Sequence, residues 1–226
     1  MPPGNTAQSF YYLVPEVMYG ASKKVMIHAD AFLSNQSRNF TIEGGSVYMK
    51  YRFLSNDDVQ KHFRMAATGR ISFNNSIISQ EDINLYGNNS GFEAGIIATQ
   101  LLHKTALSSG MSFSKATDNG NGNKNPFSGI SSNAINYTLS IGQLVLPKEY
   151  TDYKQTNLNL MVEFLNQLNL GSGKYYVDIA PSAQLIINSV ARVDLGYRQA
   201  LGSTLSRKSS NSFLLRLEYN FFNAFR

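Results

Sequence analysis

The segment from Phe213 to Phe222, close to the end of the chain, alternates regularly between apolar and polar positions. Its odd-numbered residues are all apolar or aromatic, whereas its even-numbered residues include Arg216, Glu218 and Asn220. Because successive side chains of a β-strand point to opposite faces, one face of this segment is wholly apolar. The same alternation recurs along nearly the whole chain, as it does in the strands of a membrane-spanning β-barrel.

The alternation predicts eleven strands separated by turn-rich segments. They cover residues 11–20, 25–34, 41–54, 63–74, 92–102, 107–115, 135–146, 157–167, 174–188, 192–201 and 213–222. We therefore expect an all-β fold, an antiparallel up-and-down transmembrane β-barrel of about twelve strands. Residues 1–10 are expected to form a flexible N-terminal segment and residues 11–226 a single barrel domain. A soluble β-sandwich is the less favoured alternative, because so many long, regular strands are unusual in a sandwich.

The connections between these strands differ in length. The tight turns at 21–24, 103–106 and 189–191 are assigned to the periplasmic side, and the long segments 75–91, 116–134 and 202–211 to the outside. An odd number of strands conflicts with the even number of single-chain bacterial barrels. We therefore expect that a first strand and a signal peptide are missing from this chain. The alternative is that one strand has been wrongly split or merged, most simply around 75–91.

The composition narrows the functional classes. Charged residues make up 15% of the 226 residues, against about 25% in typical soluble domains. There is no apolar run of about 18 residues that would predict a transmembrane helix. The net charge of +5 comes from scattered basic residues rather than from runs, which disfavours nucleic-acid binding. The absence of cysteine excludes disulfides and thiolate catalysis.

If the apolar faces contact lipid, the polar faces line the lumen. The candidate lumen-lining residues are Lys50, Arg52, Arg64, Arg70, Glu163, Asp178, Arg192, Asp194, Arg198, Arg216 and Glu218. One interpretation is a cross-strand salt-bridge network that fills and rigidifies a narrow lumen. The other is a basic wall opposite an acidic one, lining a conduit whose charges set selectivity. A barrel of about twelve strands lies between filled and open barrels, so its size does not decide between them.

Enzymatic chemistry is poorly supported by the sequence. His28 and Asp30 share a face of one predicted strand, but no serine-centred motif accompanies them, and His62 and His103 fall at distant turns. We therefore predict no catalytic, cofactor-binding or metal site, and no cofactor. Pro15 and Pro181 lie on the apolar faces of predicted strands, where they are expected to mark local bulges.

Three segments carry a resemblance to known proteins. They are 12–16 (YLVPE), 146–150 (LPKEY) and 213–222, the last of which resembles the C-terminal targeting strand of outer-membrane barrels, with Tyr219, Phe221 and Phe222 as its aromatics. Together they are similar to uncharacterised outer-membrane barrel proteins of the Bacteroidota, loosely placed near the phenol meta-pathway outer-membrane transporter family. The resemblance implies a Gram-negative outer-membrane location and gives little information about a substrate.

The sequence thus predicts a porin-like channel or transporter for small polar solutes in the bacterial outer membrane, with the long loops acting at the surface. The alternative is a non-conducting structural or accessory subunit of an envelope protein complex. The expected partners are the lipid bilayer, the outer-membrane assembly machinery through the strand from Phe213 to Phe222, a small polar solute, and envelope proteins. Nucleic acid is not among them.

Overall fold

A computed structural model of the chain describes residues 10–36, 39–59, 61–149, 152 and 154–222, and within them it contains strands and no helix. The strands are β1 (Tyr12–Leu13), β2 (Glu16–Gly20), β3 (Val25–Ser34), β4 (Thr41–Asp58), β5 (Lys61–Asn74), β6 (Ser90–Leu102), β7 (Thr105–Thr117), β8 (Asn133–Leu146), β9 (Asn157–Asn169), β10 (Tyr175–Ile187), β11 (Ala191–Ser203) and β12 (Asn211–Tyr219). All of them belong to one antiparallel sheet. The predicted all-β, up-and-down architecture is therefore confirmed, whereas most of the expected N-terminal segment lies outside the described residues.

The first two strands form one interrupted crossing of the sheet. Both β1 and β2 pair with β3, and the carbonyl of Pro15 between them still accepts a hydrogen bond from the Ala31 backbone at 3.1 Å. Proline has no N–H to donate to a ladder, which explains the interruption. The twelve strands thus make eleven crossings, as the alternation predicted. Pro181 interrupts the pairing of β10 with β11 without shifting its register, so the bulge expected there is absent.

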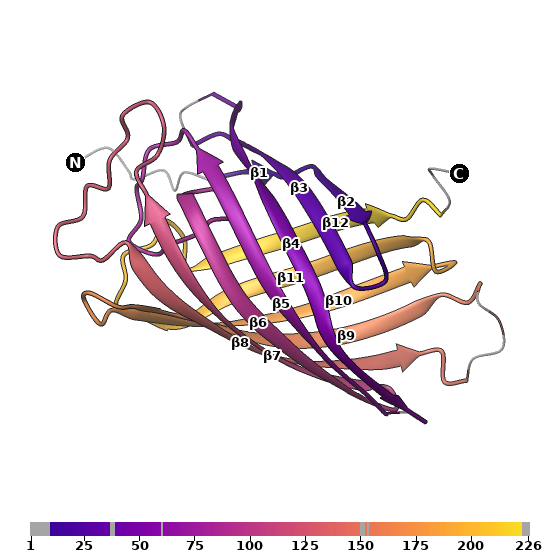
Figure 1. Cartoon of the computed structure of the whole chain (residues 1–226). Coiled ribbons are helices and arrows are strands. Elements are labelled where there is room, and N and C mark those ends of the chain that lie inside the picture. The colour runs from indigo at the N-terminus through magenta and orange to yellow at the C-terminus, as the bar shows by residue number, and fades with distance from the viewer. Residues whose placement is uncertain (1–9, 37–38, 60, 150–151, 153, 223–226) are drawn as a thin grey trace, which may run out of the picture.

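The connections gather at two ends of the sheet (Figure 1). One end, which we call the short-turn end, carries the tight turns 21–24, 103–104 and 188–190, and there β4 also meets β5 and β8 meets β9. The other end, the loop end, carries 75–89, 118–132, 170–174 and 204–210, and there β3 meets β4. From β2 onward each strand pairs with the next strand in the chain, because antiparallel hairpins need no crossover. The C-terminal strand finishes at the short-turn end.

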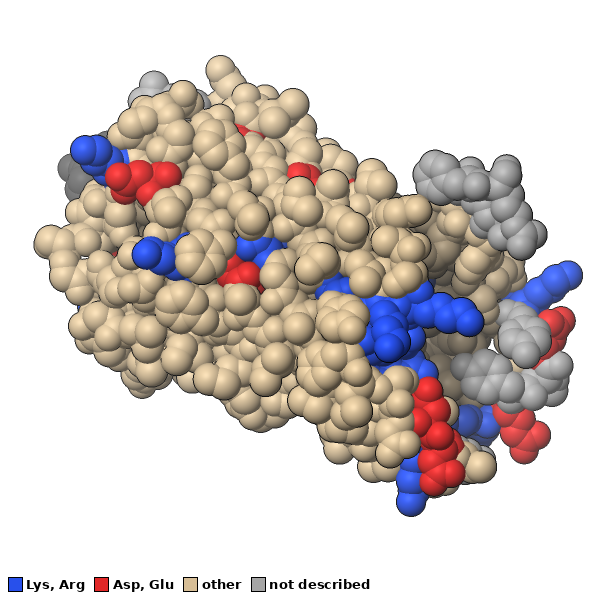
Figure 2. Space-filling model, in the orientation of Figure 1, with Lys and Arg blue, Asp and Glu red and all other residues tan. Residues whose placement is uncertain are grey.

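The alternation gives the sheet two chemically different faces. The outer face carries large apolar side chains that are mostly exposed, among them Val17, Ile71, Phe92, Leu195 and Phe213. The inner face carries polar side chains, several of which are fully buried, such as Asp178 at 0% exposure. Figure 2 shows wide uncharged areas on one side of the molecule, with the largest group of charged residues toward the end that carries the C-terminus.

The sheet curls until its two edges approach each other (Figure 1). Arg216 of β12 forms an ion pair with Glu16 of β2, with 3.0 Å between Nη2 and Oε2. These residues are 200 positions apart, and their strands lie at opposite edges of the sheet order. Such a contact requires the inner face to be concave. Along the described residues no ladder pairing joins β12 to β1 or β2.

An apolar core is small and lies at the loop end. Ile83 and Leu85 of loop 75–89 pack with Ala116 of β7 and Ala134 of β8, and all four are buried. The loop therefore lies inside the curl of the sheet, because Ala116 and Ala134 sit on the inner face. Burial of these side chains supplies the hydrophobic contribution that holds the loop inward.

Close approach of two strands predicts the effect of a glycine substitution. A Cβ at Gly44 would lie 2.0 Å from the carbonyl oxygen of Phe73, whereas a Cβ at Gly20 would meet nothing within 4 Å. We expect Gly44→Ala to lower the free energy of unfolding by about 1–3 kcal/mol, as overpacking does elsewhere. Gly20→Ala should leave it unchanged or slightly raised. Urea-induced unfolding in detergent compares the two variants; equal effects would contradict the strand spacing described.

Candidate functional site

The inner face of the sheet holds the candidate site. The ladder register places all the predicted lumen-lining residues on this face, together with Glu16, His28 and Asp30. Their alternation with the apolar outer residues follows from the period of two along each strand. The structure separates them into three ion-pair clusters, a further ion pair near the short-turn end, and a few charges that have no ion-pair partner among the described residues.

Arg70 is the centre of the first cluster. Its guanidinium lies 2.8 Å from the buried carboxylate of Asp30 and 2.5 Å from the Ser46 hydroxyl. The same group stacks over the rings of Tyr48 and Tyr86, at 5.1 and 4.8 Å from their centroids. Tyr86 belongs to loop 75–89, so this single arginine connects β3, β4 and β5 to the loop.

Asp178 is the centre of the second cluster. Its carboxylate is fully buried and binds Arg198 of β11 at 2.6 Å. It also accepts two hydrogen bonds from Arg207, at 2.6 and 2.8 Å, in a bidentate arrangement. Both guanidinium groups lie over the ring of Tyr176. Arg207 was not predicted, because it lies in connection 204–210, outside any alternating segment.

The third cluster lies where the two edges of the sheet meet. Arg216 contacts Glu16 at 3.0 Å and Glu218 at 3.7 Å, and Glu218 also contacts Arg192 at 3.2 Å. Glu16 additionally forms a short contact with Nδ1 of His28. Four charged side chains from β2, β11 and β12 thus neutralise one another across the seam.

The remaining predicted residues fall into two groups. Arg64 pairs with Asp57 at 3.2 Å near the short-turn end, and Arg52 donates to the carbonyl of Lys23 at 2.6 Å. Lys50 and Glu163, by contrast, make no hydrogen bond or ion pair with any described residue. Asp194 leaves its buried Oδ1 without a partner among the same residues.

Small side chains cover much of the inner face between β6 and β8. They are Gly91, Gly95, Thr99, Ser108, Gly110, Ser112, Ser114, Thr138, Ser140 and Gly142. The hydroxyls of Thr99 and Ser108 bond to each other at 2.8 Å, so they stay close to the wall. These small residues project little into the interior, in contrast to the arginine-rich strands β5, β11 and β12. The larger Glu93 of β6 lies on the same face, where its carboxylate accepts hydrogen bonds from Ser114 at 2.8 Å and Asn136 at 3.2 Å.

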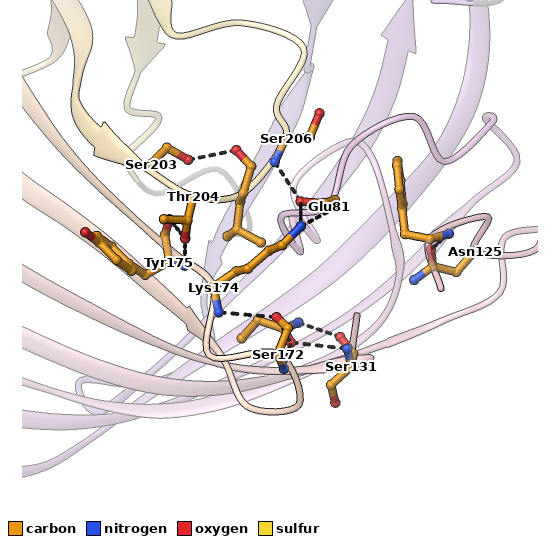
Figure 3. Close-up of polar contacts among 12 residues, drawn as sticks. Glu81, Asn125, Ser131, Ser172, Lys174, Tyr175, Ser203, Thr204 and Ser206 are labelled. Atoms are coloured by element: carbon orange, nitrogen blue, oxygen red, sulfur yellow. Dashed lines mark hydrogen bonds and ion pairs between the residues drawn. The ribbon is translucent and has the colours of Figure 1, made fainter. Parts of the chain in front are cut away.

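Loop 75–89 folds into the loop end and is fastened on several sides. Its Ile83 backbone both donates to and accepts from the buried Gln167 side chain of β9, each at 2.8 Å. Glu81 binds Lys174 at 2.8 Å and the Ser206 backbone at 2.8 Å, as Figure 3 shows. Asn119 donates to the carbonyls of Ser76 and Asn88, both at 2.8 Å. The loop is thus a built part of the interior.

The sequence of loop 75–89 contains a signal that the loop is buried. Ile78, Ile83 and Leu85 are apolar residues within a segment that is otherwise rich in Asn, Ser and Gly. A solvated surface loop has no reason to carry three large apolar side chains, all of which are buried in the structure. Gln167, which binds Ile83, lay on the predicted polar face of its strand but was not singled out.

Asp82 is the unusual group of the loop. Its side chain is 9% exposed, and its Oδ1 has no hydrogen-bond partner among the described residues. Burial raises the pKa of this carboxyl to about 6, while Arg207 and Arg198 lower it and Asp178 raises it further. Next to it, the pKa of Glu81 is lowered by its hydrogen bond with Lys174. The two neighbouring carboxyls therefore respond oppositely to acid.

The described residues contain neither a candidate metal site nor a candidate membrane-spanning helix. No group of three or more His, Cys, Asp or Glu in the described part of the chain is placed to hold a metal ion. Nor do these residues form a helix long and apolar enough to cross a membrane. Comparison with protein-family models and with curated proteins found no match to this chain.

Acidity should control how firmly the loop is docked. The docked state holds the Asp82 proton more tightly than an exposed aspartate, whose pKa is about 3.9. The resulting contribution to docking is complete below about pH 4 and is lost as the pH rises through about 6. Raising the pH from 5 to 8 should reduce the docking free energy by about 1.4 kcal/mol, a factor of about ten. Below about pH 4.5 the loss of the Glu81 charge should weaken docking again.

Amide hydrogen exchange in loop 75–89, corrected for intrinsic rates, measures this docking. Asp82→Asn should abolish the change between pH 5 and 8, because the side chain no longer titrates. Asp118→Asn, in the exposed part of connection 118–132, is the matched control and should retain it. A wild-type loop whose corrected exchange is the same at both pH values would contradict the prediction.

Removal of the Gln167 side chain should release the loop at constant pH. Gln167→Leu leaves the N–H and C=O of Ile83 without partners, at a cost of about 1–3 kcal/mol. We expect faster exchange at Ile83 with the strands still protected. Gln184→Leu removes an inner amide that, among the described residues, accepts a hydrogen bond from Asn159 and makes none with the loop. Equal exchange at Ile83 in both variants would argue against Gln167 as the anchor.

Proposed function

We propose that this chain is a bacterial outer-membrane β-barrel that conducts small polar solutes through its interior, with loop 75–89 controlling passage at the loop end. The exposed apolar residues of the outer face suit contact with hydrocarbon, and the charged groups on the inner face avoid it. A Lys or Arg facing lipid at the bilayer midplane would cost about 2–4 kcal/mol. The apolar strand ending at Tyr219 also suits recognition by the outer-membrane assembly machinery.

The observation that carries the proposal is the wall of small residues on β6 to β8, next to a carboxylate that has no partner among the residues the structure describes. Glu163 lies beside Ser140 and Ala180 in the ladders of β9. A filled interior would surround this charge with packed side chains and would need a cation to neutralise it, because a lone buried carboxylate is costly. A hydrated passage solvates it instead. Small wall residues leave the space that such a passage needs.

A non-conducting structural or accessory subunit is the second candidate. It is favoured by the three ion-pair clusters, which neutralise most of the inner arginines, and by the loop that is fastened into one end. In that case the inner network would serve rigidity, and the loop end would bind envelope partners. The two candidates differ in whether ions cross the barrel.

Conductance of the purified chain in a planar bilayer tests the proposal. We expect discrete openings at pH 8, fewer openings at pH 5, and more frequent openings with Gln167→Leu than with Gln184→Leu. The reason is that both alkaline pH and loss of Gln167 loosen the loop. A folded barrel that stays silent at both pH values and with Gln167→Leu would exclude conduction and favour the accessory subunit.

A further inference from the structure

Glu163 occupies a distinctive position on the inner face. It is the seventh of the thirteen residues of β9, so it stands at the middle of its strand. Its ladder neighbours are Ser140 and Ala180, and its neighbours on the same face of β9 are Met161 and Leu165. None of these side chains can neutralise a carboxylate. Its charge is therefore directed at whatever occupies the interior.

Lys50 is the corresponding cation. It lies in the central part of β4 on the inner face, beside Met26 of β3 and Thr68 of β5. The other basic residues predicted on β4 and β5 are engaged: Arg70 by the carboxylate of Asp30, Arg64 by that of Asp57, and Arg52 by the backbone carbonyl of Lys23. Within the described residues, the ammonium group of Lys50 has no such partner.

The two charges stand on facing walls. Along the sheet order, β9 is five steps from β4 by way of β5–β8. The return by way of β10, β11, β12, the first crossing and β3 takes six steps. In a sheet that curls until its edges touch, strands half-way round the order lie across the interior from each other. Lys50 and Glu163 thus place opposite charges on the two sides of the passage.

We propose that Lys50 and Glu163 are specificity-determining residues that make the passage selective for zwitterionic solutes of amino-acid size. This inference rests on the proposed conducting function. An anion is attracted by Lys50 and repelled by Glu163, and a cation the reverse, so a single charge gains little. A solute with an ammonium group at one end and a carboxylate at the other is favoured by both charges when it lies across the passage.

Alanine and lactamide provide a matched pair of probes. They are isomers of the same size, and only alanine is a zwitterion. The full chain, reconstituted in liposomes at pH 8, should admit alanine faster than lactamide. The double variant Lys50→Gln/Glu163→Gln should lower the alanine-to-lactamide permeability ratio by about two- to fivefold, the effect expected for losing weak solvated charge contacts. The same two permeability measurements are repeated in proteins that also carry Gln167→Leu. The test then does not depend on whether loop 75–89 is docked in the wild-type barrel.

Single and reversed variants separate field effects from changes in packing. Glu163→Gln should shift the ion selectivity of the conductance toward anions, and Lys50→Gln should shift it toward cations. The exchange Lys50→Glu/Glu163→Lys reverses the field and should retain the preference for alanine. Glu218→Gln removes a carboxylate already neutralised by Arg192 and Arg216, and should shift selectivity less than Glu163→Gln. Strand content by circular dichroism checks that each variant is folded.

The outcomes distinguish this inference from the proposed function. A conducting barrel that admits alanine and lactamide equally, or whose preference survives the double Gln variant, would overturn the inference and leave the proposed function standing. A folded barrel that admits neither solute, in the wild-type and Gln167→Leu forms alike, would overturn both. A zwitterion preference that is lost in the double Gln variant and retained in the charge exchange would support it.

Discussion

Polar and apolar residues alternate with a period of two along the strands of one curled antiparallel sheet. This alternation decides which face of the sheet each charged side chain of the strands occupies. When such a sheet curls, the face that carries the charges becomes concave, and groups that are far apart in the sequence converge. Glu16 and Arg216 meet in this way across 200 positions. Convergence in a confined space makes partners necessary, because an unpaired buried charge is far more costly than a paired one. The ion-pair clusters around Arg70, Asp178 and Arg216 are the direct result of this constraint.

The same constraint explains how the interior divides. Charged side chains find partners on nearby strands, within β3–β5, within β10–β12 and across the seam between β2 and β12. The strands between, β6 to β8, carry mostly small or uncharged side chains on the same face, and the carboxylate of Glu93 on β6 accepts hydrogen bonds from Ser114 and Asn136. Glu163 on β9 and Lys50 on β4 stand at the borders of these regions and remain without described partners. Loop 75–89 fills the loop end, where its backbone groups must bond to inner side chains such as Gln167, since they are withdrawn from water.

The fold could be predicted from the sequence because alternation is a local signal. Ten of the eleven predicted strands match single strands to within a few residues, and the first is divided only at Pro15, where a ladder donor is missing. The ion pairs between the inner side chains were harder to predict from the sequence. One of the two interpretations of the sequence was a basic wall opposite an acidic one, but Asp30 and Asp57 pair with Arg70 and Arg64 on the same side of the sheet. Which carboxylate meets which arginine depends on register, bulges and curl. Arg207 and Asp82 were missed because both lie in connections, where no periodicity reports the direction of a side chain.

The directions of the two edge strands limit how the sheet can close, and the composition of the chain gives no information about this. After eleven antiparallel crossings, the first crossing and β12 run the same way, so a direct ladder between them would be parallel. In the residues described, the edges are joined instead by side chains, through Arg216, Glu16 and the sulfur of Met18 at 3.7 Å. Side-chain contacts fix the separation of two strands less rigidly than a backbone ladder does. The curvature of the interior, and with it the distance between the walls that carry Lys50 and Glu163, therefore depends on this seam.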